Sequence, residues 1–113
     1  MTKQAALNLW RDVLAKHICE APADLTNRQM CLLLTVYLDA QPHTIRGLAA
    51  TLRLSKPVVS RALNTLAATG YVTRRRDPDD GRNVFIERTP PGRAYLESLG
   101  AIVAEQHQKI ITR

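Results

Sequence analysis

The sequence predicts an α+β fold that is mostly helical, and three observations support this prediction. Two short helical patterns, at residues 45–52 and 56–69, are separated by a tight turn. Two β-prone runs follow at residues 71–76 and 84–88, around a loop rich in turn-forming residues. Two helices joined by a tight turn and followed by a hairpin form a winged helix-turn-helix. The length of 113 residues predicts one domain, residues 1–113, with the winged-helix core at 25–89 and terminal helices at 1–21 and 90–113.

Two longer helices are predicted before this motif. Residues 4–19 form an amphipathic pattern whose apolar face comprises Ala6, Trp10, Val13, Leu14, His17 and Ile18. The second helix begins after Thr26, an N-cap residue with Gln29 at the capping-box position. Its expected buried stripe comprises Met30, Leu33, Leu34, Tyr37 and Leu38. We expect this second helix to support the helix-turn-helix.

The helix-turn-helix has clear boundaries in the sequence. Thr44 is the expected N-cap of its first helix, and Ser55 is the expected N-cap of its second. Pro57 falls in the first turn of the second helix, where a missing N–H is tolerated, and Gly70 is suited to end it. The side chains expected to face the core of the motif are Leu48, Ala49 and Leu52, then Val59, Ala62, Leu63 and Leu66.

The other face of the second helix is polar, small and free of carboxylates. Its candidate DNA-binding residues are Ser55, Lys56, Pro57, Ser60, Arg61 and Asn64. Such a helix fits the major groove, where Arg and Lys contact guanine, Asn contacts adenine and Ser contacts either. Arg61 is the strongest candidate for a base contact, whereas Lys56 is expected to meet a phosphate.

The two β-prone runs and the last helix complete the pattern. Residues 77–83 contain aspartates, a proline, a glycine and an asparagine, which favour a turn between two strands. Thr89 is the expected N-cap of the last helix, with prolines in its first turn. Apolar spacing then continues through Tyr95, Leu99, Ile102, Val103, Gln106 and Ile110.

Positive charge is concentrated in the predicted winged helix. The chain has a formal net charge of +6 and a sequence pI of about 9.9. Residues 43–88 contain nine basic and four acidic side chains, and so account for five of the six net charges. Basic charge in such a motif favours a polyanion through counterion release. The alternative is a solvated basic surface that maintains solubility.

Catalytic and metal-binding patterns are lacking. The three histidines fall in separate elements, with His43 expected in a loop, and none follows a nucleophile motif. Asp77, Asp79 and Asp80 do not meet the spacing of a calcium-binding loop. We therefore expect no enzyme activity, no cofactor and no metal site. Without a secretory signal or membrane span, we expect a cytoplasmic protein with reduced cysteines, Cys31 lying in the core.

One ordered set of short motifs resembles the MarR family of winged-helix transcription regulators over residues 25–96. The motifs are Leu25-Thr26 with Gln29, Leu48-Ala49, Leu54-Ser55-Lys56 with Val59-Ser60-Arg61, Leu66 with Gly70-Tyr71-Val72 and Arg75, Asp77-Pro78 with Asp80-Gly81-Arg82, and Thr89 with Gly92. Each piece alone is weak, and their common order and spacing carry the resemblance.

The resemblance implies specific roles in the wing. In the family, an aspartate at the wing tip orients an arginine that enters the minor groove, and the matching residues are Asp80 and Arg82. A narrow minor groove favours arginine independently, because its negative potential is enhanced. The alternative is a salt bridge within the wing. Arg75 matches a frequent family arginine whose role is structural or electrostatic, and Ile45 lies where relatives often have a short first strand.

The resemblance also implies a biological role. It implies a repressor that acts as a homodimer, through its terminal helices, on a pseudo-palindromic DNA site. Relatives often respond to a small-molecule effector, and some sense oxidants through a cysteine, for which Cys19 is the candidate here. Relatives usually have two long C-terminal helices, whereas this sequence predicts one. The competing hypothesis is a winged-helix module in a replication, partition or other assembly.

Overall fold

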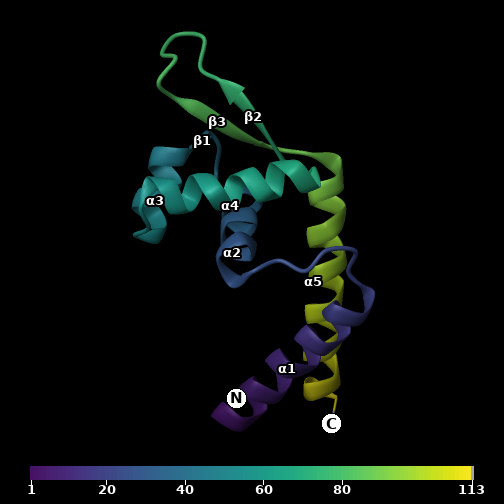
Figure 1. Ribbon diagram of the computed structural model, residues 1–113. Helices are drawn as coiled ribbons and strands as arrows, with labels where there is room; N and C mark the ends of the chain where they lie inside the picture. The colour runs from purple at the N-terminus through teal and green to yellow at the C-terminus, as the bar shows by residue number, and fades with distance from the viewer. Residues whose placement is uncertain (113) are drawn as a thin grey trace. The chain divides into compact units, whose positions relative to one another are not determined.

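The computed structural model describes residues 1–112. In chain order, the elements are α1 (Lys3–Glu20), α2 (Asn27–Leu38), β1 (His43–Thr44), α3 (Ile45–Leu52), α4 (Lys56–Thr69), β2 (Val72–Arg76), β3 (Val84–Arg88) and α5 (Pro90–Ile111) (Figure 1). Five helices and one small sheet confirm the predicted α+β, mostly helical class. The chain forms two compact units, residues 1–24 with the chain from Tyr95 onward, and residues 25–94.

The first unit packs α1 against the later part of α5. The Thr2 hydroxyl accepts the N–H of Ala5 at 3.0 Å and so caps α1. The buried residues at this contact are Val13, His17, Tyr95, Leu99, Ile102 and Gln106. Nε2 of His17 lies 2.8 Å from the Tyr95 hydroxyl, and Lys16 forms an ion pair with Glu105 at 2.8 Å. Of the predicted α1 face, Val13 and His17 are covered, whereas Trp10, Leu14 and Ile18 are exposed.

The second unit is the winged helix, and its N-caps lie where the sequence predicts them. Thr26 and Gln29 form both hydrogen bonds of the capping box. The hydroxyls of Thr44 and Ser55 accept N–H groups in the first turns of α3 and α4. Arg53 adopts the left-handed conformation, with φ of 54°, and this turns the chain between the two helices. All four predicted core residues of α4 are buried: Val59, Ala62, Leu63 and Leu66.

The sheet has three strands where the sequence predicts two. Both strands of the hairpin pair antiparallel with Arg74 opposite Ile86, and β1 adds to the other edge of β3. The family resemblance places a short strand at Ile45, but this residue already begins α3 and the strand comprises His43 and Thr44. His43, expected in a loop, is buried, and its Nε2 lies 3.1 Å from the carbonyl oxygen of Asp39. The loop prediction is wrong because β1 pairs with a strand far along the chain.

The buried face of α2 differs from the prediction. Leu32, Leu33 and Val36 are the buried residues, whereas Leu38 is 76% exposed. Cys31, expected in the core, is also exposed. Helix α2 is apolar around most of its circumference, so its periodicity does not determine which face is covered. Contacts with α4 and β3 decide the face instead.

The hairpin is fastened to the start of α5 by polar contacts. The Thr89 hydroxyl donates to the carbonyl of Gly70 at 2.7 Å and accepts the N–H of Gly92 at 3.1 Å, so Thr89 caps α5 as predicted. The N–H of Thr89 donates to the hydroxyl oxygen of Tyr37 at 2.8 Å. Arg88 donates to the carbonyls of Val36 and Asp39 at the end of α2. These contacts hold the base of the wing against the helices.

Candidate nucleic-acid interface

Helix α4 presents two chemically different faces. Its buried face holds it on the core, and Lys56, Pro57, Arg61 and Asn64 are exposed on the other side. Ser60 is half-buried, at the edge of the exposed face nearest the hairpin. Ser55 precedes the helix, and its hydroxyl is engaged as the N-cap. The structure therefore brings the six candidate residues of this segment to one helix and its N-terminus, and none of them is acidic.

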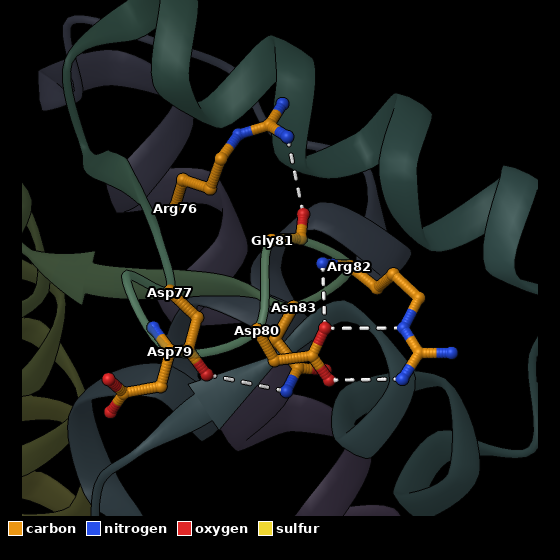
Figure 2. A network of polar contacts seen from close by, with 7 residues as sticks. All are labelled: Arg76, Asp77, Asp79, Asp80, Gly81, Arg82 and Asn83. Atoms are coloured by element: carbon orange, nitrogen blue, oxygen red, sulfur yellow. Dashed lines mark hydrogen bonds and ion pairs between the residues drawn. The ribbon is translucent and has the colours of Figure 1, made fainter.

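The wing tip holds Asp80 and Arg82 as a pair (Figure 2). Nε of Arg82 donates to Oδ1 of Asp80 at 3.2 Å, and the backbone N–H of Arg82 donates to the same oxygen at 3.1 Å. The Asp80 carboxylate holds Nε of Arg82 in place. The Arg82 side chain is nevertheless 86% exposed, so its guanidinium remains open to solvent. This geometry has the Asp80–Arg82 pair that the resemblance implies, and it is compatible with a groove contact or with a salt bridge confined to the wing.

The Arg82 contact changes the acidity of Asp80. The guanidinium of Arg82 lowers the pKa of Asp80 below its ordinary value, and the Arg82 backbone N–H acts in the same direction. Because hydrogen bonds to the charged carboxylate favour its ionised form, Asp80 stays ionised and keeps Arg82 oriented at neutral pH. The charge of Arg46, in the first turn of α3, adds a smaller effect of the same sign.

Other polar contacts shape the loop that carries this pair. Oδ1 of Asp77 accepts the N–H of Asp79 at 2.9 Å, and Oδ2 lies 3.4 Å from the amide nitrogen of Asn83. Arg76 donates to the carbonyl of Gly81 at 3.2 Å (Figure 2). The aspartates thus serve the turn, as expected for a turn-rich wing. Among residues 1–112, no group of three or more His, Cys, Asp or Glu side chains could hold a metal ion.

Two of the three consecutive arginines of β2 contact partners outside the loop: Arg74 and Arg75. Arg74 donates to the carbonyl of Ser60 at 3.1 Å and links the wing to α4. Arg75 is paired with Phe85 across the sheet, has its guanidinium carbon 4.8 Å from that ring, and forms an ion pair with Glu87 at 3.2 Å. Part of its charge is therefore compensated within the wing, which favours the structural part of its expected role.

Two arginines that contribute to the α4 and wing surface were not predicted from the sequence. Arg74 is not among the predicted DNA-binding residues, although alternation along the strand places its side chain on the opposite face from Arg75, and the structure shows that this face meets α4. Arg46 is also outside it, and no sequence signal links it to the wing tip. Cys19, the candidate redox residue, is exposed in the last turn of α1. Within residues 1–112, no helix combines the length and apolar character needed to cross a membrane.

Comparison with solved structures supports the same fold. The chain is similar to the transcriptional regulator Tm0710 from Thermotoga maritima, with 24% identity and a TM-score of 0.78 over 97% of this chain and 75% of that one. It is also similar to a mutant of S. aureus MepR bound to an oligodeoxyribonucleotide, with 24% identity and a TM-score of 0.86 over 98% of this chain and 79% of that one. At these identities, the likeness establishes the winged-helix fold.

Comparison with sequences assigns the family. The chain is 34% identical over 67 residues to the HTH-type transcriptional repressor YetL of Bacillus subtilis (strain 168). The match covers 58% of this chain and 40% of that protein, so the chain spans less than half the length of this curated relative. The model of the MarR family matches residues 23–83, which include α2, the helix-turn-helix and most of the wing. The chain belongs to the MarR family.

Proposed function

We propose that this protein is a sequence-specific double-stranded DNA-binding transcription repressor that acts as a homodimer on a pseudo-palindromic site. One observation carries the proposal. Helix α4 is anchored by its apolar face and exposes Lys56, Arg61 and Asn64 beside a basic wing. That exposed face contains no carboxylate that phosphates would repel. The family consists of transcription regulators, and the curated relative is named a repressor.

The proposed contacts fall into two classes. Arg61 contacts a guanine through two hydrogen bonds, and Asn64 and Ser60 contact bases or phosphates at the edges of the same groove. Lys56 contacts phosphate, while Ser55 and Pro57 set the start of the helix. Arg82 enters the minor groove with its orientation set by Asp80, and Arg75 adds a weaker contribution because Glu87 already pairs with it.

A row of exposed apolar residues on α1 supports the homodimer. Leu7, Trp10, Leu14 and Ile18 recur at spacings of three or four residues, and so lie along one side of the helix. A soluble chain seldom leaves such a row uncovered. A second copy that buries it would form a dimer with two copies of α4, one for each half-site. Two-fold symmetry then predicts half-sites about one helical turn apart.

Selection of random duplex DNA by the purified protein tests the proposal. Enriched sites are then titrated at two salt concentrations beside a scrambled duplex. We expect a two-fold motif bound far more tightly than the scrambled sequence. A single enriched half-site would contradict the symmetric dimer. Steep salt dependence without enrichment would replace sequence-specific regulation with an architectural or assembly role.

Two substitutions separate base contacts from groove contacts. Arg61→Ala should weaken binding to the selected site by about 1–3 kcal/mol and relax the preference at one base position. Arg82→Ala should weaken binding with a smaller change in preferred sequence. Equal weakening by Arg61→Ala on every duplex would contradict its base-reading role.

The proposed repressor responds to a small-molecule effector, as the family resemblance implies, and this response needs its own assay. Compounds that release the selected duplex from the protein would identify the effector. The same assay with peroxide, followed by a thiol, tests the proposed redox role of Cys19. If a Cys19→Ser protein still responds to peroxide, Cys19 is not the sensor.

A further inference from the structure

Helix α4 has a second flank, opposite the wing, where Arg61 is the only residue to which a DNA contact has been assigned. On the wing side, Arg74 reaches the carbonyl of Ser60 at the edge of α4. On the other side, Arg61 and Thr65 of α4 border a groove of about 250 Å³. Its other wall is the first turn of α2, which contributes Thr26, Arg28 and Gln29. The groove therefore runs along the exposed face that carries the proposed base contact.

The chemistry of this groove suits an anion. Arg28 and Arg61 come from different helices, and both line the groove. No acidic side chain lines it, and within residues 1–112 neither guanidinium has an ion pair. The two positive charges that share this groove repel each other, and a bound phosphate would attract both and so offset that repulsion. Arginine binds phosphate strongly because its planar donors match two phosphate oxygens.

The N-terminus of α2 adds positive electrostatic potential to that of the two arginines. The capping box uses the N–H groups of Thr26 and Gln29, so those of Asn27 and Arg28 are left for an outside acceptor. The positive end of a helix dipole stabilises an anion by a modest amount. The helix dipole therefore adds to anion binding in the groove, but the specific feature of the groove is its two arginines.

The geometry of a duplex explains why both flanks matter. A helix in the major groove lies between two phosphate backbones, so a well-matched surface has cations on both sides of the helix. The wing and Arg74 provide one side here. We propose that Arg28 is a DNA-binding residue that contacts a backbone phosphate in the α2–α4 groove, on the flank opposite the wing. This inference rests on the proposed function, since it assumes that α4 enters the major groove.

Salt titration of an Arg28→Gln variant tests the inference. Wild type, Arg28→Gln and Arg11→Gln are titrated with the selected duplex and a scrambled duplex over a range of salt concentrations. Arg11→Gln is the matched control, because it removes one exposed arginine charge from α1. Loss of one phosphate contact per subunit, and so of two per bound homodimer, should reduce the slope of log affinity against log salt by about 1.8 on both duplexes. Arg11→Gln should keep the wild-type slope, and Arg28→Lys should restore most of the lost slope.

Each contrary result has a distinct meaning. An unchanged slope for Arg28→Gln, with the wild-type unfolding curve, overturns the inference and leaves the proposed function intact. A loss confined to the selected duplex also overturns it, because that is the behaviour of a base contact. If wild type itself shows no DNA binding that depends on salt, the proposed function fails first.

A second measurement separates DNA from free anions. The Nε–H resonance of Arg28 is followed by NMR during additions of duplex or inorganic phosphate. We expect a shift at micromolar duplex and none at the same concentration of phosphate. An equal shift with inorganic phosphate alone would identify a site for free anions and overturn the assignment to the DNA backbone.

Discussion

Gly92 is the position at which the smallest change should have a large effect. It lies in the first turn of α5, where the chain leaves β3. A Cβ atom added there would overlap the hydroxyl oxygen of Tyr37 and the carbonyl oxygen of Tyr71, and would lie 2.9 Å from Cζ of Tyr37. The Tyr71 carbonyl belongs to the backbone, so rotation of a side chain cannot relieve the whole overlap. We therefore predict that Gly92→Ala strongly destabilises the winged helix.

The magnitude follows from the contacts that must move. The Tyr37 hydroxyl has the carbonyls of Tyr71 and Thr89 within 2.9 Å and accepts the N–H of Thr89 at 2.8 Å. Overpacking a close-packed site costs about 1–3 kcal/mol, and each hydrogen bond lost there adds about 0.5–1.5 kcal/mol. The better helix propensity of alanine offsets up to about 1 kcal/mol. If one of these hydrogen bonds is lost, the ranges combine to a fall of roughly 0.5–4.5 kcal/mol in the free energy of unfolding, centred at about 2.5 kcal/mol.

Urea denaturation provides the measurement, with Gly100→Ala as the matched control. Gly100 lies in the same helix, and a Cβ added there meets no atom within 4 Å. It should therefore leave stability unchanged or raise it by up to about 1 kcal/mol. All proteins are compared at one low concentration, so that association contributes equally. If Gly92→Ala unfolds at the wild-type midpoint, the close approach of Gly92 to Tyr37 and Tyr71 is wrong.

Three further predictions concern the other helices and the wing. Thr26→Ala removes the hydroxyl that accepts the N–H of Gln29, and should lower the free energy of unfolding by about 1 kcal/mol in urea denaturation; a loss below a few tenths would indicate a different cap. Arg82 lowers the pKa of Asp80, so their contact should persist through the ordinary aspartate titration range and be lost only as pH falls below it; NMR titration of both side chains should give one common midpoint, and separate midpoints would contradict the pairing. Trp10 is 51% exposed in the single chain, so its fluorescence should shift to shorter wavelength as protein concentration rises, and emission independent of concentration, in a protein shown to dimerise, would exclude α1 from the interface.

Local patterns in the sequence determine most of the elements of this fold. The caps at Thr26, Thr44 and Ser55 are visible because capping depends on residues only a few positions apart. The buried side of α4 is predictable because its apolar residues occupy one face only. The wing is predictable because two β-prone runs flank a cluster of turn formers.

Contacts between distant segments decide the features that were predicted wrongly. The burial of His43 depends on β3, which lies more than forty residues later in the chain. The exposure of Cys31 and Leu38 depends on which side of α2, a largely apolar helix, meets α4 and β3. Periodicity shows which residues share a face of a helix. When most faces are apolar, it does not show which face the neighbouring elements bury.

The candidate site divides in the same way. The sequence alone determined a basic, carboxylate-free helix with Arg61 on its outer face, and a turn that carries Asp80 and Arg82, because residue type and spacing are enough for both. Only the tertiary structure decided that Arg75 is held by Glu87 and Phe85, that Arg74 links the wing to α4, and that Arg28 borders the same groove as Arg61. The physical reason is that the partners in each of these contacts lie on different elements, and only the packing of those elements brings them together.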